Sequence, residues 1–278
     1  MDQGDAIFAG TMAEMTWREV EDAAKDNAVA LWAFGVIEQH GLHLPAGTDV
    51  YLPSARLRRV KAVLAERGVP SVIVPPFYWG VNFVSAAFPV SFQVRPQIMI
   101  ELMVDIFASI VRDGFKQTFC VTGHGDALHN KTIIEAIQRG RAETRTDISF
   151  LAEDGLLKRL GVELADPRVT PFPSAPSTAT FPDIHAGQWE TSIMLAICPS
   201  LVHQDKLPGI PPVQFSPADL QDWRSAPEIA RRKTPMGHVG EPALANPQAG
   251  QKDLDAGALA MAEAIIQRRN RISSPSRA

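Results

Sequence analysis

The sequence predicts a three-layer α/β/α sandwich with a mostly parallel central sheet, folded as one domain over residues 1–278. Short apolar runs alternate with longer segments whose apolar residues recur at helical spacing. Strands that alternate with helices pair in parallel through right-handed crossovers, and the helices then cover both faces of the sheet. The composition agrees, because 45% hydrophobic and 21% charged residues in 278 suffice for one sizeable core.

Four apolar or β-branched runs are expected to form the strands, at residues 28–37, 71–74, 117–122 and 148–151. We expect the second of them to stop at Pro75 and Pro76, because proline cannot donate a ladder hydrogen bond.

Seven segments with helical periodicity are expected to be helices, at residues 16–26, 52–67, 96–113, 128–144, 153–160, 186–197 and 254–271. Thr16, with Glu19 three residues later, predicts a capping box at the start of the first helix. Pro96 suits the first turn of the third helix, and Gly114 ends it.

The remaining segments are expected to be irregular. Residues 77–92 are aromatic, and residues 167–182 contain five of the 22 prolines and are predicted to form an ordered loop or lid. Residues 207–241 are again rich in proline, and residues 273–278 are predicted to be a disordered tail.

Composition also excludes several classes of protein. A net charge of −4 argues against a nucleic-acid surface, and no apolar stretch has the length of a membrane span. The N-terminal residues lack the basic region of a signal peptide, so a cytoplasmic location is expected. Cys120 and Cys198 each lie in an apolar run, which predicts buried free thiols.

The first candidate site follows the first predicted strand. Glu38, His40, His43 and Asp49 lie within a dozen residues, among glycines and a proline that turn the chain. If the strand reaches Glu38 and His40, these two side chains share a face, and the turn can return Asp49 to them. Mixed oxygen and nitrogen donors suit zinc, manganese or iron(II) better than calcium. The alternative is ordinary loop polarity, with Asp49 as a helix cap.

Two further clusters follow. His124 lies between two glycines at the end of the third strand, with Asp126 two residues later, and these could complete a ligand set. The alternative is a glycine-rich turn in which Asp126 caps the next helix. His185 and Glu190 lie five residues apart at the start of another predicted helix.

Taken together, these motifs resemble those of the creatininase (creatinine amidohydrolase) family. They read Glu-Gln-His-Gly-x-His-Leu-Pro-x-Gly-Thr-Asp, Gly-His-Gly and His-Ala-Gly-x-x-Glu-Thr-Ser, and residues 237–242 resemble the family's late Gly-Val-x-Gly-Asp-Pro segment. The resemblance covers residues 17–266. It implies an amidohydrolase with two divalent metal ions per subunit, zinc or manganese with iron as an alternative, assembled as a homohexamer.

The family pattern also implies roles for individual residues. Glu38 and His124 would bind one metal, His40 would bind the other, and Asp49 would bridge them. Creatininase has a glutamate where this chain has Asp126.

Asp126 and Glu190 are therefore both candidates for the remaining ligand. His185 matches the family's proton-transferring histidine, which takes a proton from the attacking water and returns it to the amide nitrogen.

The chain departs from the family in the loop after the second strand. Where the family reads Gly-x-Ser-x-Glu-His-x-x-Phe-Pro-Gly-Thr, this chain keeps Phe88-Pro89 but has Asn82 for serine and Val84-Ser85 for Glu-His. Phe181 stands where creatininase has tryptophan. We therefore expect a flatter or aromatic amide or lactam as the small-molecule substrate, rather than creatinine. The candidate substrate contacts are Asn82, Phe83, Ser85, Phe181 and Trp189.

Other readings stay open. Each aromatic taken alone could be a core or subunit contact. Within the family, the alternatives are deformylation of a formamidopyrimidine and trimming of a small peptide precursor. Outside catalysis, the chain could be a metal-binding assembly protein without turnover.

Overall fold

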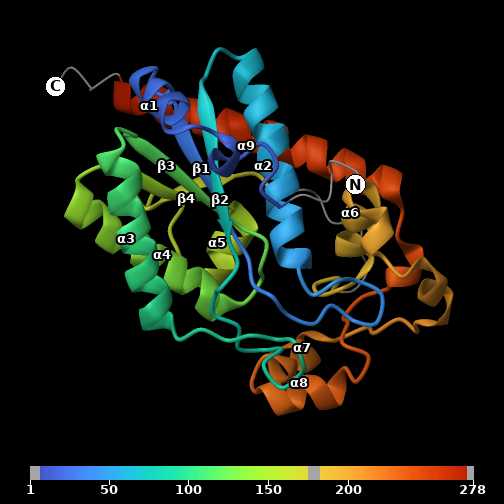
Figure 1. Ribbon diagram of the computed structural model, residues 1–278. Coiled ribbons are helices and arrows are strands. Elements are labelled where there is room, and N and C mark those ends of the chain that lie inside the picture. Colours follow the sequence, from blue (N-terminus) through green and yellow to red (C-terminus); the bar gives the residue numbers. More distant parts are fainter. Residues whose placement is uncertain (1–6, 175–181, 274–278) are drawn as a thin grey trace.

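The computed structural model describes residues 7–174 and 182–273 and contains a five-stranded parallel sheet in the order β2-β1-β3-β4-β5 (Figure 1). Its strands are β1 (Val29–Phe34), β2 (Ser71–Phe77), β3 (Gln117–Thr122), β4 (Asp147–Glu153) and β5 (Val169–Phe172). β3 lies at its centre between β1 and β4, and every residue of β1 is buried, as expected for a parallel strand covered on both faces. The predicted fold class is confirmed.

The helices fall into long ones that cover the sheet and short ones near its ends. The long helices are α2 (Thr48–Glu66), α3 (Pro96–Arg112), α4 (Ala127–Thr144) and α9 (Pro247–Ser273). The shorter ones are η2 (Met12–Glu14), α1 (Trp17–Lys25), α5 (Asp154–Leu160), α6 (Gln188–Ile197), η3 (Pro199–Leu201), η4 (Gln204–Gly209), α7 (Pro217–Trp223), α8 (Pro227–Lys233) and η5 (Pro242–Leu244). The predicted capping box of α1 is present.

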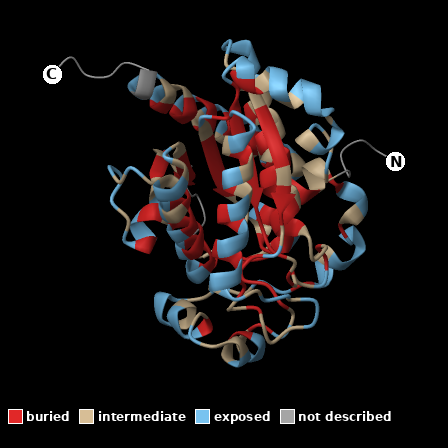
Figure 2. Ribbon diagram, turned by 60° about the vertical axis from the view of Figure 1, so that its left-hand side comes forward, coloured by how far each residue is buried: buried red, intermediate tan, exposed pale blue. Residues whose placement is uncertain are grey.

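Alternate residues of β1 point to opposite faces of the sheet and pack into two separate hydrophobic cores. On one face Trp32 packs edge-on against Phe107 of α3, with ring centroids 5.3 Å apart, within the core formed with α3 and α4. On the other face Leu31 joins the core formed with α2 and α9. Figure 2 shows buried residues concentrated in the sheet and on the helix faces that meet it. Cys120 and Cys198 are buried thiols rather than halves of a disulfide, as predicted.

Both edge strands correct the sequence prediction. β2 does not stop before Pro75 and Pro76 but continues to Phe77, and β5 contains Pro171 within a segment expected to be a loop. Proline is tolerated in these strands because an edge strand needs ladder hydrogen bonds on one side only. The Trp32 indole also donates to the Pro75 carbonyl at 3.0 Å.

Other boundaries differ as well. β1 ends at Phe34, so the expected strand over residues 28–37 is too long. α2 starts at Thr48 and α9 at Pro247, earlier than predicted, and residues 207–241 contain α7 and α8. Residues 175–181 of the expected lid and 274–278 of the expected tail lie outside the described residues. Within the described residues, no helix combines the length and apolar character needed to cross a bilayer.

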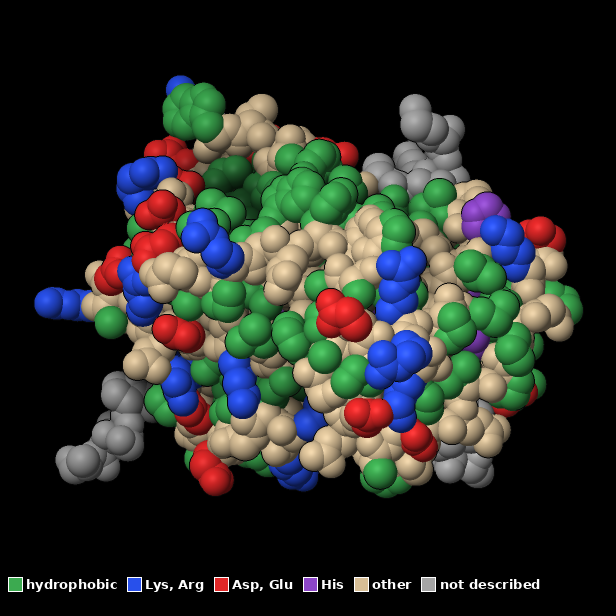
Figure 3. Space-filling model, turned by 90° about the horizontal axis from the view of Figure 1, so that it is seen from below, with side chains coloured by type: hydrophobic (Ala, Val, Ile, Leu, Met, Phe, Trp, Pro, Cys, Tyr) green, Lys and Arg blue, Asp and Glu red, His purple; other side chains and the backbone are tan. Residues whose placement is uncertain are grey.

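The carboxyl ends of all five strands meet at the lower edge of the sheet in Figure 1. The connections after β1, β2 and β3 cross this edge, with α7 and α8 below them (Figure 1), and Figure 3 views the molecule from this side. Ligands of open α/β sheets bind at this edge, so the fold places the predicted motifs where a site is expected.

Candidate metal centre

The start of α2 fixes Asp49 between the ends of β1 and β3. Pro53 lacks the N–H that would bond the Asp49 carbonyl in a regular helix. That carbonyl oxygen instead packs against the backbones of Gly35 and Gly123, which follow β1 and β3, and a Cβ at either glycine would collide with it. The two glycines therefore permit the close approach that seats Asp49 at the centre of the sheet edge.

Asp49 meets two other side chains on one side. His124 Nδ1 lies 2.8 Å from Asp49 Oδ2 and 3.0 Å from Glu38 Oε1. One donor atom from each of these three buried residues lies within 4.8 Å of the others.

Asp49 also meets a second pair. His40 Nε2 lies 3.2 Å from Asp49 Oδ1 and 3.8 Å from Glu190 Oε2. These three buried residues again bring donor atoms within 4.8 Å of one another, so Asp49 belongs to both triads. Glu38 and His40 lie beyond β1 in an irregular connection, which is held by Glu38 N donating to Ala46 O at 3.0 Å. They converge although the strand does not reach them.

Several of these donor atoms lack a hydrogen-bond partner in the part of the protein that the structure describes. Among the described residues, Glu38 Oε1, His40 Nε2 and Asp49 Oδ2 are buried without a well-formed hydrogen bond. Unpartnered buried polar atoms are costly and rare, so several that converge indicate a group that binds there. Carboxylate and imidazole donors in this mixture suit zinc, manganese or iron(II), and the residues fit a divalent metal.

The charged groups of the two triads also favour a bound cation. Burial opposes the charged form of His40, but Asp49 and Glu190 outweigh it and raise its pKa to about 10. Burial likewise opposes a charged His124, yet Glu38 and Asp49 raise its pKa well above the ordinary value. Burial raises the pKa of Glu190 to about 7. Three buried carboxyl groups that lie close together are stabilised by nearby positive charge. A metal ion would supply that charge in place of the protons on the imidazoles.

His185 lies beside these two triads and, with Glu38 and His40, forms a further group of buried residues whose donor atoms lie within 4.8 Å of one another. Its Nδ1 is 3.8 Å from Glu38 Oε1, and its ring centroid is 4.5 Å from that of His40. Its Nε2 lies 2.9 Å from both the Gln39 carbonyl oxygen and the Gln39 side-chain nitrogen. The first contact is a hydrogen bond when the ring carries its proton on Nε2, and the second when it carries the proton on Nδ1. Burial lowers the pKa of His185 to about 4, so the ring is neutral at neutral pH.

Asn82 and Ser85 lie beside Glu38. The Ser85 hydroxyl donates to Glu38 Oε2, and its oxygen lies 2.9 Å from Asn82 Oδ1 and 3.1 Å from Ser91 Oγ. Both side chains are buried, and Asn82 Nδ2 has no hydrogen-bond partner among the described residues. The structure therefore places this polar pair next to a candidate ligand, where it orients the carboxylate.

Asp126 is engaged differently from the other predicted ligands. Its Oδ1 accepts from the backbone N–H of Leu128 at 2.7 Å and of His129 at 3.3 Å, so it caps α4. Its Oδ2 accepts from Phe83 N and Val84 N at 3.1 and 3.3 Å. The carboxylate joins none of the donor triads found among the described residues.

The predicted aromatic contacts are scattered. The Phe83 backbone is tied to Asp126, and its side chain is partly buried. Trp189 is 38% exposed on α6, with the Arg56 guanidinium 5.8 Å from its ring centroid. Phe181 lies outside the described residues.

Sequence reasoning did not identify three neighbours of the site. Gln39 contacts His185, and Asp183 accepts from Gln188 N and Trp189 N, both at 2.8 Å, at the start of α6. Trp223 of α7 lies 6.2 Å from His185, ring to ring. Gln39 belongs to the first quoted motif and could have been inferred from it, and Asp183 lies two residues before the third motif. Nothing in the proline-rich segment singles out Trp223.

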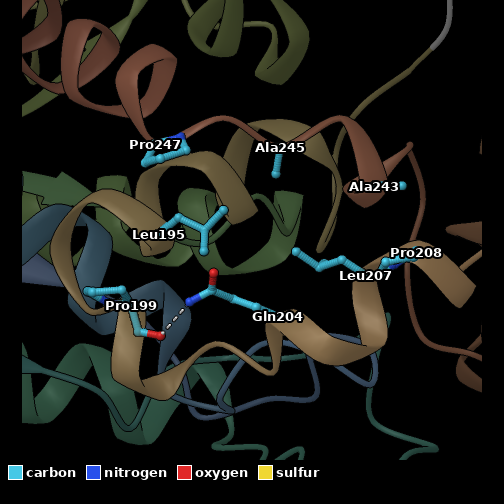
Figure 4. A pocket seen from close by; sticks show the side chains of 8 residues that line it. All are labelled: Leu195, Pro199, Gln204, Leu207, Pro208, Ala243, Ala245 and Pro247. Carbon is cyan, nitrogen blue, oxygen red and sulfur yellow. Dashed lines mark hydrogen bonds between the residues drawn. The ribbon is translucent and has the colours of Figure 1, made fainter.

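A cavity of about 520 Å³ lies elsewhere, between α6, η4 and η5 (Figure 4). Leu195, Leu207 and Gln204 line it, and Gln204 Nε2 donates to the Pro199 carbonyl at 3.4 Å. None of the candidate metal ligands lines this cavity, so it is separate from the triads.

Comparison with known proteins agrees with the geometry. Residues 13–265 match the family model of creatininase, creatinine amidohydrolase. The chain is 27% identical over 227 residues to the creatinine amidohydrolase of Pseudomonas putida, covering 77% of this chain and 81% of that protein. It is 23% identical over 228 residues to the 3-dehydro-scyllo-inosose hydrolase of Thermotoga maritima, covering 81% of this chain and 68% of that protein.

Solved structures show the same fold. A crystal structure of creatininase matches with a TM-score of 0.72 at 22% identity, covering 93% of this chain and 97% of that chain. A manganese form of creatininase matches with a TM-score of 0.72 at 23% identity, covering 93% of this chain and 98% of that chain. The family match over most of the sequence confirms the predicted resemblance: this chain is a hydrolase that belongs to the creatininase family.

Proposed function

We propose that this protein is a dinuclear metal-dependent hydrolase that cleaves a non-peptide C–N bond in a small linear or cyclic amide other than creatinine. The observation that carries the proposal is the position of Asp49, which belongs to both donor triads. A carboxylate with one oxygen in each triad is suited to bridge two cations. A single ion would leave one triad of buried charges without compensation.

We propose Glu38, Asp49 and His124 as ligands of one ion, and His40, Asp49 and Glu190 as ligands of the other. Related structures include a manganese form of creatininase and a mutant of the Zn-Zn type, which favours zinc or manganese, with iron(II) as the alternative. Divalent ions in these positions supply Lewis acidity toward a substrate carbonyl and lower the pKa of water.

Glu190 is favoured over Asp126 as the last ligand. One Glu190 oxygen lies 3.8 Å from His40 Nε2 and accepts from Ala186 N at 2.5 Å, so the carboxylate is anchored beside the triad. Each Asp126 oxygen already accepts hydrogen bonds from two backbone N–H groups, and a metal ion would have to break these hydrogen bonds.

His185 is the proposed proton carrier. We propose the tautomer with the proton on Nε2, which donates to the Gln39 carbonyl and leaves a lone pair on Nδ1 facing the site. A neutral imidazole in that position accepts a proton from the attacking water and returns it to the leaving nitrogen, which cannot depart as an anion. The Gln39 carbonyl keeps its hydrogen bond in both protonation states, so it holds the ring in one orientation.

The substrate class rests on the loop after β2. Val84 and Ser85 stand where the family carries charge, and Phe83 and Trp189 are the proposed apolar contacts, with Phe181. Ser85 and Asn82 act through Glu38 in this proposal. One relative is a creatinine amidohydrolase, one related structure is a complex with the open-chain compound creatine, and another relative is a 3-dehydro-scyllo-inosose hydrolase, so the cyclic compounds creatinine and 3-dehydro-scyllo-inosose both belong in the test. The homohexamer and the cytoplasmic location stay predictions.

The test is a substrate panel on metal-replete protein. It compares aromatic and aliphatic formamides, acetamides, lactams, creatinine and 3-dehydro-scyllo-inosose, each with and without a chelator. We expect chelator-sensitive hydrolysis of at least one amide or lactam, at a rate above that for creatinine, and no hydrolysis by Asp49→Asn.

Turnover that survives both the chelator and Asp49→Asn would contradict the metal mechanism. If only the inosose or only creatinine is hydrolysed, the protein is a hydrolase but the proposed substrate class is wrong.

A further inference from the structure

A second polar cavity lies at the amino-terminal edge of the sheet, at the opposite end of the strands from the metal centre. It has a volume of about 760 Å³, and four cationic residues from three parts of the chain line it: Lys116, Arg141, Arg145 and Arg269. Lys116 precedes β3, Arg141 and Arg145 end α4, and Arg269 belongs to α9. A strand of six residues spans roughly 20 Å, so this cavity and the metal centre are independent sites.

Positive charge exceeds negative charge around this cavity. Asp147 is the acidic residue that lines it, and this carboxylate already pairs with Arg268 at 2.6 Å and Arg141 at 2.8 Å. Within the described residues, Lys116 and Arg145 form no ion pair, and Lys116 Nζ contacts only the neutral Asn27 amide, at 2.8 Å. The C-terminal ends of α4 and α9 also lie at this edge and contribute about half a negative charge each, which offsets only part of the excess.

The backbone conformation of Arg145 is unfavourable for most residues other than glycine. It ends α4 with a φ of 57°, in the left-handed region that glycine adopts without penalty. Glycine holds the equivalent position after α2, α3 and α5, where Gly68, Gly114 and Gly161 are at positive φ, whereas Asn27 after α1 is, like Arg145, a non-glycine residue at positive φ. A side chain kept where glycine would be more stable indicates a role for that side chain.

We infer that this cavity binds a small anion that carries two or more phosphate groups. Guanidinium groups present paired donors that match phosphate oxygens, and an ammonium group adds a point charge. The volume lies within the usual range of small-molecule sites and accommodates either an inorganic polyphosphate or a nucleotide. The two sources share the phosphate chain that the cations recognise, and the test separates them.

The test is calorimetric titration of the metal-replete protein with inorganic tripolyphosphate and, separately, with ATP. We expect saturable binding of tripolyphosphate at one site per chain, weakened about tenfold by Lys116→Gln, because a hydrogen bond to a charged group is lost. ATP binding tighter than tripolyphosphate would identify a nucleotide site, and the reverse order an inorganic one.

Arg145→Gly supplies the sharper test. It should weaken binding about tenfold and yet raise the melting temperature of the free protein by about 2 °C, because it relieves the left-handed backbone. Arg67→Gln, which removes one exposed cation just after α2 without touching the cavity, is the matched control and should bind as wild type.

The inference is overturned if tripolyphosphate does not bind, or if Arg67→Gln weakens binding as much as Lys116→Gln, since general ionic attraction would then explain the result. It is also overturned if Lys116→Gln and Arg145→Gly both bind as wild type, because the anion would then occupy the metal centre.

Discussion

Two conservative substitutions separate a metal ligand from a helix cap. Glu190→Gln and Asp126→Asn each replace a buried carboxylate with the amide of the same length. Glu190 lies in the triad with His40 and Asp49, whereas both Asp126 oxygens accept backbone N–H groups. We therefore expect the two substitutions to have opposite effects on metal content and on stability.

The magnitudes follow from the contacts. In Asp126→Asn one oxygen becomes an NH₂ group that faces two backbone donors, either at residues 83–84 or at residues 128–129. A buried donor left without its acceptor costs about 1–3 kcal/mol, so we expect about 2 kcal/mol of lost stability. For a chain of this size that lowers the melting temperature by about 4–8 °C. Glu190→Gln keeps an acceptor for Ala186 N and removes a buried charge beside Asp49, so the metal-free protein should be no less stable.

The assay measures each property separately. Thermal melts in excess chelator report the stability of the metal-free fold, and elemental analysis after dialysis against metal-free buffer reports retained metal. Glu190→Gln should keep about half of the wild-type metal, because one of two ions loses an anionic donor. Asp126→Asn should keep all of it.

The reverse pattern would refute the assignment. If Asp126→Asn loses metal while Glu190→Gln retains the full complement, Asp126 is the ligand despite its four backbone contacts. If both variants retain full metal, neither carboxylate is a required donor.

Three further substitutions test other parts of the account. Val90→Gly should stabilise the protein by about 1 kcal/mol in chemical denaturation, because Val90 has a φ of 63°, which is strained for a β-branched residue; a loss of stability would contradict this. Arg268→Met should cost about 3 kcal/mol, because Asp147 keeps Arg141 but loses its 2.6 Å partner, and the carbonyls of Val169 and Pro167 lose a donor. Burial opposes the Asp147 carboxylate, but Arg268 outweighs it and keeps its pKa below the ordinary value, so the wild-type advantage is present at neutral pH and lost on acidification below about pH 4. An equal loss of stability at pH 7 and pH 3 would exclude this pair as the cause. His185→Ala should retain metal while turnover falls about 100- to 10,000-fold, and unchanged turnover would reject its role.

The layers of the fold could be predicted from the sequence because apolar periodicity records which face of an element is buried. The helix over residues 96–113 and the strand over residues 117–122 match α3 and β3 closely. Proline misled the prediction at β2 and β5, because the sequence does not state which strands lie at the sheet edges. In α2, Pro53 likewise lies inside a helix, where it frees the Asp49 carbonyl.

Part of the candidate site could also be predicted from the sequence. Motif residues near strand ends converge because parallel strands share a carboxyl edge, and this brings Glu38, Asp49 and His124 together. The sequence could not choose between Asp126 and Glu190, because both lie next to helix starts and only the hydrogen bonds distinguish a cap from a free carboxylate. Trp223 could not be inferred, because its position beside His185 depends on the packing of α7.

Metal stoichiometry of the wild-type protein and of Asp49→Asn tests the central claim most directly. Elemental analysis after metal loading and dialysis should find about two zinc or manganese ions per wild-type chain and almost none in the variant, because both ions share this carboxylate. Asp166→Asn, which removes a carboxylate paired with Arg168 away from the triads, is the control and should bind as wild type. One ion per wild-type chain, or two ions retained by Asp49→Asn, would contradict the bridging role.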